Sequence, residues 1–192
     1  LSLHDALPIF STMNTQQIIE YVDSHPSGKV KLAIADIDGI LRGKYISKQK
    51  FMSVIEGNLG FCDVVFGWDM ADVCYDNVNI TGWHSGYPDA KARLDLSTFR
   101  RIPYENDVPF FLGEFINDDA SPAYYCPRQL LKKVIQDATN EGFKPFFSQE
   151  FEWFNFEETP HSVHEKGYKN LKPMTDGMFG YSILRSTLRN DF

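Results

Sequence analysis

Two glutamates, Glu150 and Glu152, stand one residue apart in an aromatic run that covers residues 146–156. Runs rich in Phe and Trp favour β-strands, so the sequence predicts a strand here. Side chains at positions i and i+2 of a strand project from the same face, about 6 to 7 Å apart. Two unpaired like charges are costly to bury. The pair therefore predicts either a solvated strand face or a site where cations hold both carboxylates.

Length, composition and charge limit the classes of protein to consider. The chain has 192 residues, of which 43% are hydrophobic and 15% aromatic, so a packed core is expected. A formal net charge of -7 argues against nucleic-acid binding. Cys62, Cys74 and Cys126 form no CxxC pair, which predicts reduced thiols. No apolar stretch approaches the roughly 18 residues of a membrane helix. We expect a cytoplasmic protein without nucleic-acid or membrane partners.

Composition and turn signals divide the chain into three parts. Residues 1–12 look like the translation of a sequencing adapter and carry no signal-peptide pattern, so we expect a non-native leader before Met13. Residues 13–117 and 118–192 form two further parts, separated by the polar, turn-rich stretch 117–122. The last part ends without a closing element, which predicts an incomplete domain.

Capping residues and helical spacing predict three helices. Asn14 or Thr15 can cap the first, which stops near Pro26. The second covers residues 48–56 and ends at Gly57. The third begins at Pro127 and ends before Gly142, and its apolar stripe consists of Leu130, Leu131, Val134, Ile135 and Ala138.

Turn residues and β-forming runs predict a small, mostly antiparallel sheet, and with the helices an α+β fold. Two strand-like runs meet at Asp38-Gly39, a dipeptide that favours a tight antiparallel hairpin. The expected strands in the second part of the chain are residues 30–36, 41–47, 61–68, 77–83, 92–96 and 108–115.

Residues 32–41 resemble the first motif of haloacid-dehalogenase-type phosphohydrolases. In that family a strand presents an aspartate nucleophile, with a second acid two residues later, and Asp36 and Asp38 would take those places. The family usually has Thr or Val where this chain has Ile40. A hairpin turn that needs Asp-Gly explains the same residues, so we favour the hairpin and keep a phosphatase as an alternative.

A second resemblance extends over residues 28–192. Residues 36–51 resemble the opening hairpin of the glutamine synthetase family, and residues 126–131 resemble the helix that enters its catalytic domain. Residues 149–154, Gln-Glu-Phe-Glu-Trp-Phe, are similar to the family's metal-binding strand, and residues 177–185 to the Gly-Tyr segment that follows. The resemblance implies an N-terminal β-grasp domain followed by the truncated start of an α/β catalytic domain.

The resemblance also implies an ATP-dependent ligase. Such enzymes join ammonia or another amine to the γ-carboxylate of glutamate through an acyl phosphate, with Mg²⁺ or Mn²⁺ neutralising the phosphate oxygens. By this resemblance Glu150 and Glu152 are metal ligands. The nucleotide-binding residues stay unknown, and the family implies a ring-forming homo-oligomer.

One departure from the family concerns the amine. Glutamine synthetases carry a Phe-Asp-Gly-Ser-Ser loop that binds and deprotonates ammonium, whereas this chain reads Val-Phe-Gly-Trp-Asp-Met-Ala-Asp over residues 65–72. Asp69 is the best candidate for the catalytic acid, and Asp72 is the next. The change is compatible with a larger amine, as in a γ-glutamylpolyamine synthetase.

The family's remaining metal ligands are expected beyond Phe192, so we expect this chain alone to be inactive. A non-catalytic structural member of the family is a further alternative. Intact downstream ligands in the parent gene would favour the enzyme, and their loss would favour the structural protein.

Overall fold

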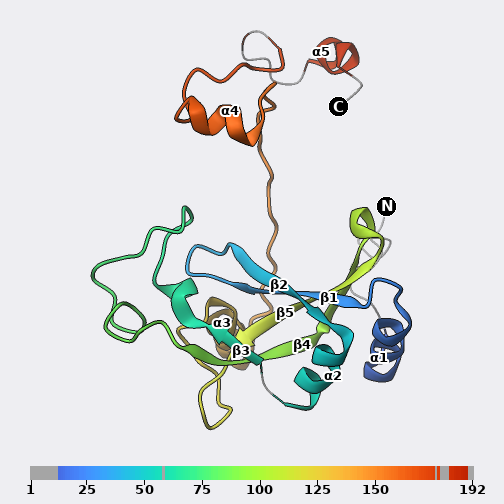
Figure 1. The fold of residues 1–192 in the computed structure, drawn as a ribbon, viewed down its shortest axis with the longest axis vertical. Coiled ribbons are helices and arrows are strands. Elements are labelled where there is room, and N and C mark those ends of the chain that lie inside the picture. The colour runs from blue at the N-terminus through green and yellow to red at the C-terminus, as the bar shows by residue number, and fades with distance from the viewer. Residues whose placement is uncertain (1–12, 58, 176, 178–181, 190–192) are drawn as a thin grey trace. The chain divides into compact units, whose positions relative to one another are not determined.

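The computed structural model describes residues 13–57, 59–175, 177 and 182–189, so the predicted leader lies outside the described residues. The chain forms two compact units, Leu1–Pro145 and Phe146–Phe192, which are described separately below. Within the described ranges, no helix is both long and apolar enough to cross a bilayer. Helices and a five-stranded sheet confirm the α+β class (Figure 1).

The first unit is built on one mixed sheet with the strand order β2-β1-β5-β4-β3 (Figure 1). β1 and β2 form the predicted antiparallel hairpin, and Gly39 in its turn has a φ of +82°, which favours glycine. β1 also pairs in parallel with β5, an arrangement that the sequence patterns did not predict. The strands are β1 (Lys29–Ala35), β2 (Leu41–Ser47), β3 (Leu59–Cys62), β4 (Asp89–Ile102) and β5 (Val108–Phe115).

Two helices, α1 (Thr15–Ser24) and α2 (Lys48–Glu56), confirm the predicted bounds. The side chain of Asn14 accepts a hydrogen bond from the backbone N–H of Gln17, and the side-chain oxygen of Gln17 accepts one from the backbone N–H of Asn14. This capping box satisfies amide groups that the first helical turn leaves unpaired. At the start of α2 the side chain of Ser47 accepts a hydrogen bond from the backbone N–H of Lys50, and the helix ends at Gly57.

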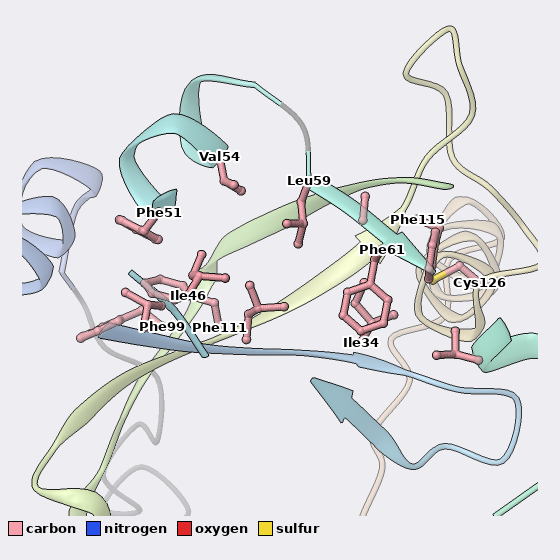
Figure 2. Packing of buried hydrophobic residues seen from close by; sticks show 14 of the residues in the cluster. Ile34, Ile46, Phe51, Val54, Leu59, Phe61, Phe99, Phe111, Phe115 and Cys126 are labelled. Atoms are coloured by element: carbon pink, nitrogen blue, oxygen red, sulfur yellow. The ribbon is translucent and has the colours of Figure 1, made fainter. Parts of the chain in front are cut away.

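The hydrophobic core lies between α2 and one face of the sheet. Figure 2 shows Phe51 and Val54 of α2 directed toward the side chains of the strands. The rings of Phe51 and Phe111 stack with their centroids 5.1 Å apart, and Phe99 lies 5.5 Å from Phe111. Each fully buried aromatic side chain stabilises the fold by about 1.5–3 kcal/mol. This packing holds α2 against the sheet of the first unit.

Two predicted strands are shorter or absent. The run 61–68 is a strand only to Cys62, after which residues 63–66 form a short 3₁₀ helix. Residues 77–83 form bends and a turn, and within them buried Thr81 donates its hydroxyl to Asp63 at 2.5 Å. The predicted strand 92–96 is part of the longer β4, which has a bulge between Asp95 and Arg100.

Helix α3 (Pro127–Asn140) has the predicted start, but its apolar stripe faces outward within the first unit. Leu130, Leu131 and Val134 are each about half exposed, at 47%, 51% and 54%. Gln129 is instead buried, and its Nε2 donates to the carbonyl oxygen of Phe115 at 3.3 Å. Polar side chains therefore join α3 to β5.

The second unit contains two short helices, α4 (Pro160–Glu165) and α5 (Ile183–Leu188). The predicted strand at 146–156 is wrong, since its residues form no ladder and only Phe156 makes a single bridge, to Pro173. Aromatic residues favour strands only where a neighbouring strand accepts their backbone groups. Part of the predicted segment 177–185 lies outside the described residues.

Candidate functional site

Glu150 and Glu152 lie on the surface of the second unit, in the stretch called here the Glu150 segment (residues 146–156). Both glutamates are exposed, and the intervening Phe151 and neighbouring Trp153 are 73% and 72% exposed. Because no strand forms, the alternation of strand faces does not align the two carboxylates. Their role as metal ligands stays a prediction.

The chemistry of this pair fits a hard divalent cation, but only in part. Two carboxylates offer oxygen ligands of the kind that Mg²⁺ and Mn²⁺ prefer. In the described part of the chain, no group of three or more His, Cys, Asp or Glu side chains comes together. A cation held here would therefore need further ligands from water, from substrate phosphate or from other protein segments.

Asp69 lies in a small hairpin of the first unit, called here the Asp69 loop (residues 67–75). The backbone of the loop closes by hydrogen bonds from Tyr75 N to Gly67 O at 2.8 Å and from Asp69 N to Val73 O at 3.0 Å. Oδ1 of Asp69 accepts hydrogen bonds from the amides of Ala71 and Val73, at 2.8 and 3.0 Å. The carboxylate therefore stabilises its own turn through one oxygen.

Asp72, the second candidate acid, sits three residues further along the same turn. Its φ is +65°, the left-handed region that Asp tolerates better than most residues. Its Oδ1 pairs with Nη1 of Arg42, although the Asp72 side chain is 58% exposed. The structure thus brings Asp69 and Asp72 together in one turn, and Arg42 beside them.

Arg42 on β2 joins this turn to the buried sheet. Its Nε donates to Oδ2 of Asp36 at 2.7 Å, and its Nη2 donates to the carbonyl oxygen of Asp69 at 3.1 Å. The hydrogen bonds with Asp36 and with Asp72 raise the pKa of the Arg42 guanidinium above its ordinary value. The guanidinium is therefore a fixed positive charge between the sheet and the Asp69 loop.

Asp36 is completely buried, and all its described partners are structural. Oδ1 accepts from the amides of Asp38 and Ile40, at 2.9 and 2.8 Å, while Oδ2 accepts from Arg42. A nucleophilic aspartate must reach its substrate, and this carboxylate is enclosed by the hairpin turn. The geometry therefore opposes the phosphatase alternative and supports the hairpin interpretation of the motif.

Trp68 completes the contact between Arg42 and the loop. The guanidinium carbon lies 4.9 Å from the centre of the indole ring, within the range of a cation–π interaction. The buried indole Nε1 has no hydrogen-bond partner among the described residues. The orientation of the ring therefore depends on the guanidinium and on packing rather than on an indole hydrogen bond.

Comparison with known proteins gives the family of this chain. Over 94% of its length the chain is 51% identical to type-1 glutamine synthetase 2 of Dictyostelium discoideum. Over 94% of its length it is also 30% identical to a glutamate–isopropylamine ligase of a Pseudomonas species. The chain belongs to the glutamine synthetase family. No protein-family model matches the chain.

The match covers only part of these glutamine synthetase relatives. The chain spans 35% of the length of the Dictyostelium protein and 40% of the Pseudomonas ligase. A solved glutamine synthetase from Plasmodium falciparum superposes on 69% of the chain and 24% of its own, with a TM-score of 0.50 and 19% identity. At that identity the structural likeness supports the fold alone.

Besides the ion pairs of Arg42, a network of ion pairs around Glu114 and Asp95 holds α3 to the sheet of the first unit. Glu114 is 2% exposed and accepts from Arg93 at 2.9 Å and from Lys132 at 2.6 Å. Asp95 accepts from Arg128 at 2.5 Å and from Lys132 at 3.0 Å. Burial acts to raise the pKa of Asp95, but hydrogen bonds from Ser97, Arg128 and Lys132 outweigh it and hold that pKa well below its ordinary value.

A hollow of about 590 Å³ lies over β2, β1, β5 and β4 in the same unit. Its lining includes Lys31, Ala33, Tyr45 and Phe110, and none of Asp69, Asp72, Glu150 or Glu152. The hollow therefore does not coincide with any of the candidate acids.

Sequence reasoning missed Arg42 as a partner of the Asp69 loop. The signal was present in the hairpin itself, because antiparallel pairing from the Asp-Gly turn sets Arg42 opposite Ile34, beside Asp36. The partner on the other side could not be deduced, because Asp72 is 30 residues away and reaches Arg42 only through the fold of the Asp69 loop.

Proposed function

We propose that this chain is part of an ATP-dependent ligase that joins an amine to the γ-carboxylate of glutamate. The observation that carries this proposal is the 51% identity to type-1 glutamine synthetase 2 over 94% of the chain. The 30% identity to a glutamate–isopropylamine ligase supports an amine ligase in the wider sense. Both relatives are longer than this chain, so the activity belongs to a longer protein.

In this proposal the γ-carboxylate of glutamate attacks the γ-phosphorus of ATP, forming γ-glutamyl phosphate and releasing ADP. The amine then attacks the acyl carbon, loses a proton, and displaces inorganic phosphate. Mg²⁺ or Mn²⁺ supplies positive charge to the phosphate oxygens when bound. Glu150 and Glu152 would hold such ions through their carboxylate oxygens, and both side chains are exposed to receive them.

Asp69 is the candidate that binds the amine and accepts its proton, with Asp72 as the second candidate. Support comes from their shared turn and from the fact that only Oδ1 of Asp69 accepts the two amides described above. The amine is ammonia or a larger amine, as in γ-glutamylpolyamine synthetases. The replacement of the family's Phe-Asp-Gly-Ser-Ser loop favours the larger one.

The finer architecture follows the same proposal. We assign residues 13–117 to a β-grasp domain, since the β1–β2 hairpin, the crossing helix α2 and the central parallel pair β1–β5 support that topology. Residues 118–192 would begin an α/β catalytic domain. The whole protein would be a cytoplasmic, ring-forming homo-oligomer, and the present chain alone would be inactive.

The test is an assay of ligase activity on the longer protein, whose chain continues beyond Phe192. We expect phosphate release that requires ATP, glutamate and an amine, measured with ammonium, isopropylamine, ethanolamine and putrescine. The double variant Glu150→Gln, Glu152→Gln should lose this activity, while Lys169→Gln, an exposed lysine of the second unit, serves as the control. A full-length protein that assembles into rings but forms no γ-glutamyl product would contradict the ligase and favour a structural protein.

A further inference from the structure

Arg42 is the link between the Asp69 loop and the buried part of the first unit. Its three guanidinium nitrogens address three different groups: the Asp36 carboxylate, the Asp72 carboxylate and the Asp69 carbonyl oxygen. The planar fork of arginine suits such simultaneous contacts, and a lysine ammonium cannot reproduce them. The Arg42 side chain is only 16% exposed, so these contacts are partly shielded from water.

The sheet end of this link is rigid. Asp36 is 0% exposed, and two amides of the β1–β2 turn and the Arg42 Nε satisfy its oxygens. The amide of Asp36 itself donates to the carbonyl oxygen of Ile40 at 2.9 Å. A buried carboxylate with three good hydrogen bonds sets the position of its cation closely, since any displacement leaves charge unpaired.

The tip of the loop has little else to fix it, whereas Trp68 at the start of the loop packs against the hydrophobic core. Met70 and Val73 are 73% and 60% exposed, so the tip of the Asp69 loop buries little apolar surface. The hydrogen bonds of Asp69 to Ala71 and Val73 hold the shape of the turn, but they do not attach it to the sheet. Loops with few buried contacts open readily unless polar contacts attach them.

We propose that Arg42 is a positioning residue that holds the Asp69 loop in the orientation in which its carboxylates meet the amine. The proposal rests on the proposed function for the identity of that ligand, whereas the attachment of the loop stands on the geometry alone. In this role Arg42 acts through the backbone of Asp69 and the side chain of Asp72.

The attachment is tested by hydrogen exchange on the 192-residue chain with Arg42→Ala and Arg42→Lys. Arg42→Lys keeps a cation beside buried Asp36, so the fold is retained even if Arg42→Ala unfolds. In Arg42→Lys the amides of Ala71, Val73 and Tyr75 should exchange about tenfold faster or more, because hydrogen bonds to charged groups are lost. The amides of β1 and β5 should keep their rates.

The control is Lys44→Ala on the same strand, whose ammonium lies 5.1 Å from the Phe61 ring. This variant should leave the exchange of the three loop amides unchanged. Unchanged loop exchange in both Arg42 variants, with the sheet intact, would overturn the attachment of the loop.

The role in amine binding is tested by steady-state kinetics of the full-length protein. Arg42→Lys should raise the KM for the amine about tenfold, while the KM values for ATP and glutamate stay within about twofold. Equal increases for all three substrates, or no increase for the amine, would overturn this role. If the wild-type full-length protein makes no γ-glutamyl product, the proposed function and the amine role both fail, and the exchange experiment still decides whether Arg42 holds the loop.

Discussion

The two stretches that carry the candidate acids differ in how their carboxylates are held. In the Asp69 loop, Asp69 accepts two backbone amides and Asp72 pairs with Arg42, which is itself bound to a buried carboxylate. In the Glu150 segment, both glutamates are exposed on a stretch without regular structure. The first stretch is attached to the sheet through Arg42. The second contacts its own unit at its end, where the carbonyl oxygen of Asn155 accepts from Met174 and Phe156 bridges Pro173.

This difference teaches that acidic residues alone do not make a preorganised site. Positioned catalytic groups need neighbours whose own positions are fixed by packing and hydrogen bonds. Asp36 supplies that support to the Asp69 loop through Arg42. The predictions below test whether the contrast between the two stretches is as large as the contacts indicate.

The largest effect is expected for Asp36→Ala. Removing the buried carboxylate leaves the Nε of Arg42 and two turn amides without their acceptor, so the first unit should lose about 3–5 kcal/mol of unfolding free energy. The paired change in the other stretch, Glu150→Ala with Glu152→Ala, should alter stability by no more than about 0.5 kcal/mol. Hydrogen exchange of the slowest amides of β1 and β5 measures the first value, and urea unfolding followed by circular dichroism measures the second. Equal losses would remove the contrast.

A smaller difference is expected between two tryptophans. Trp68→Ala removes the ring under Arg42 and should destabilise the first unit by about 2 kcal/mol, since both packing and a cation–π contact are lost. Trp153→Ala in the Glu150 segment removes a ring that is 72% exposed, so its effect should be below about 0.5 kcal/mol. The free energies of unfolding from urea titrations compare the two. A larger loss for Trp153→Ala would show that this segment is packed in solution.

Acid should act locally on the second unit, at a carboxylate just beyond the Glu150 segment. Hydrogen bonds from Lys166, from the Ser162 hydroxyl and from the Lys172 amide lower the pKa of Glu158 from 4.5 to about 2. Because the folded pKa is depressed, this stabilisation is present above about pH 4.5 and is lost as the pH falls toward 2. The amide of Ser162 should therefore exchange faster as the pH falls through this range, after correction for the intrinsic rate. In Glu158→Gln this pH dependence should disappear; a variant that keeps it would assign the effect to another group.

The smallest signal is expected from metal titration of the 192-residue chain. Two exposed glutamates that no third His, Cys, Asp or Glu side chain joins in the described part of the chain should not saturate with Mg²⁺ or Mn²⁺ below about 1 mM. Calorimetry should give the same trace for the wild type and for Glu150→Gln with Glu152→Gln. Saturation at micromolar concentration that the double variant abolishes would show that the Glu150 segment is already an organised site.

Local signals predicted the elements whose stability is local. The Asp38-Gly39 turn predicted the β1–β2 hairpin, and α2 covers the predicted residues 48–56 and ends at Gly57. The parallel pairing of β1 with β5 could not be predicted, because it joins segments far apart in the sequence. The same limit explains the predicted strand at the Glu150 segment, whose aromatic residues have the propensity but find no neighbouring strand.

The candidate site was predictable to a similar degree. The acids at Asp69 and Glu150 were visible as residue types, since their spacing and the family resemblance single them out. Arg42 was not, because its importance arises from contacts with Asp36 six residues before it and with Asp72 thirty residues after it. Side chains that act by connecting two segments have no signature in either segment alone.

The parallel pairing of β1 with β5 also has a consequence for synthesis on the ribosome. The β1–β2 hairpin can form early, but the other edge of β1 has no partner until residues 108–115 have been made and released. An unpaired strand edge can pair with other chains, and contacts between distant segments form slowly. During translation β1, an inner strand of the finished sheet, is therefore an open edge, and this interval is when the nascent chain most needs protection from aggregation.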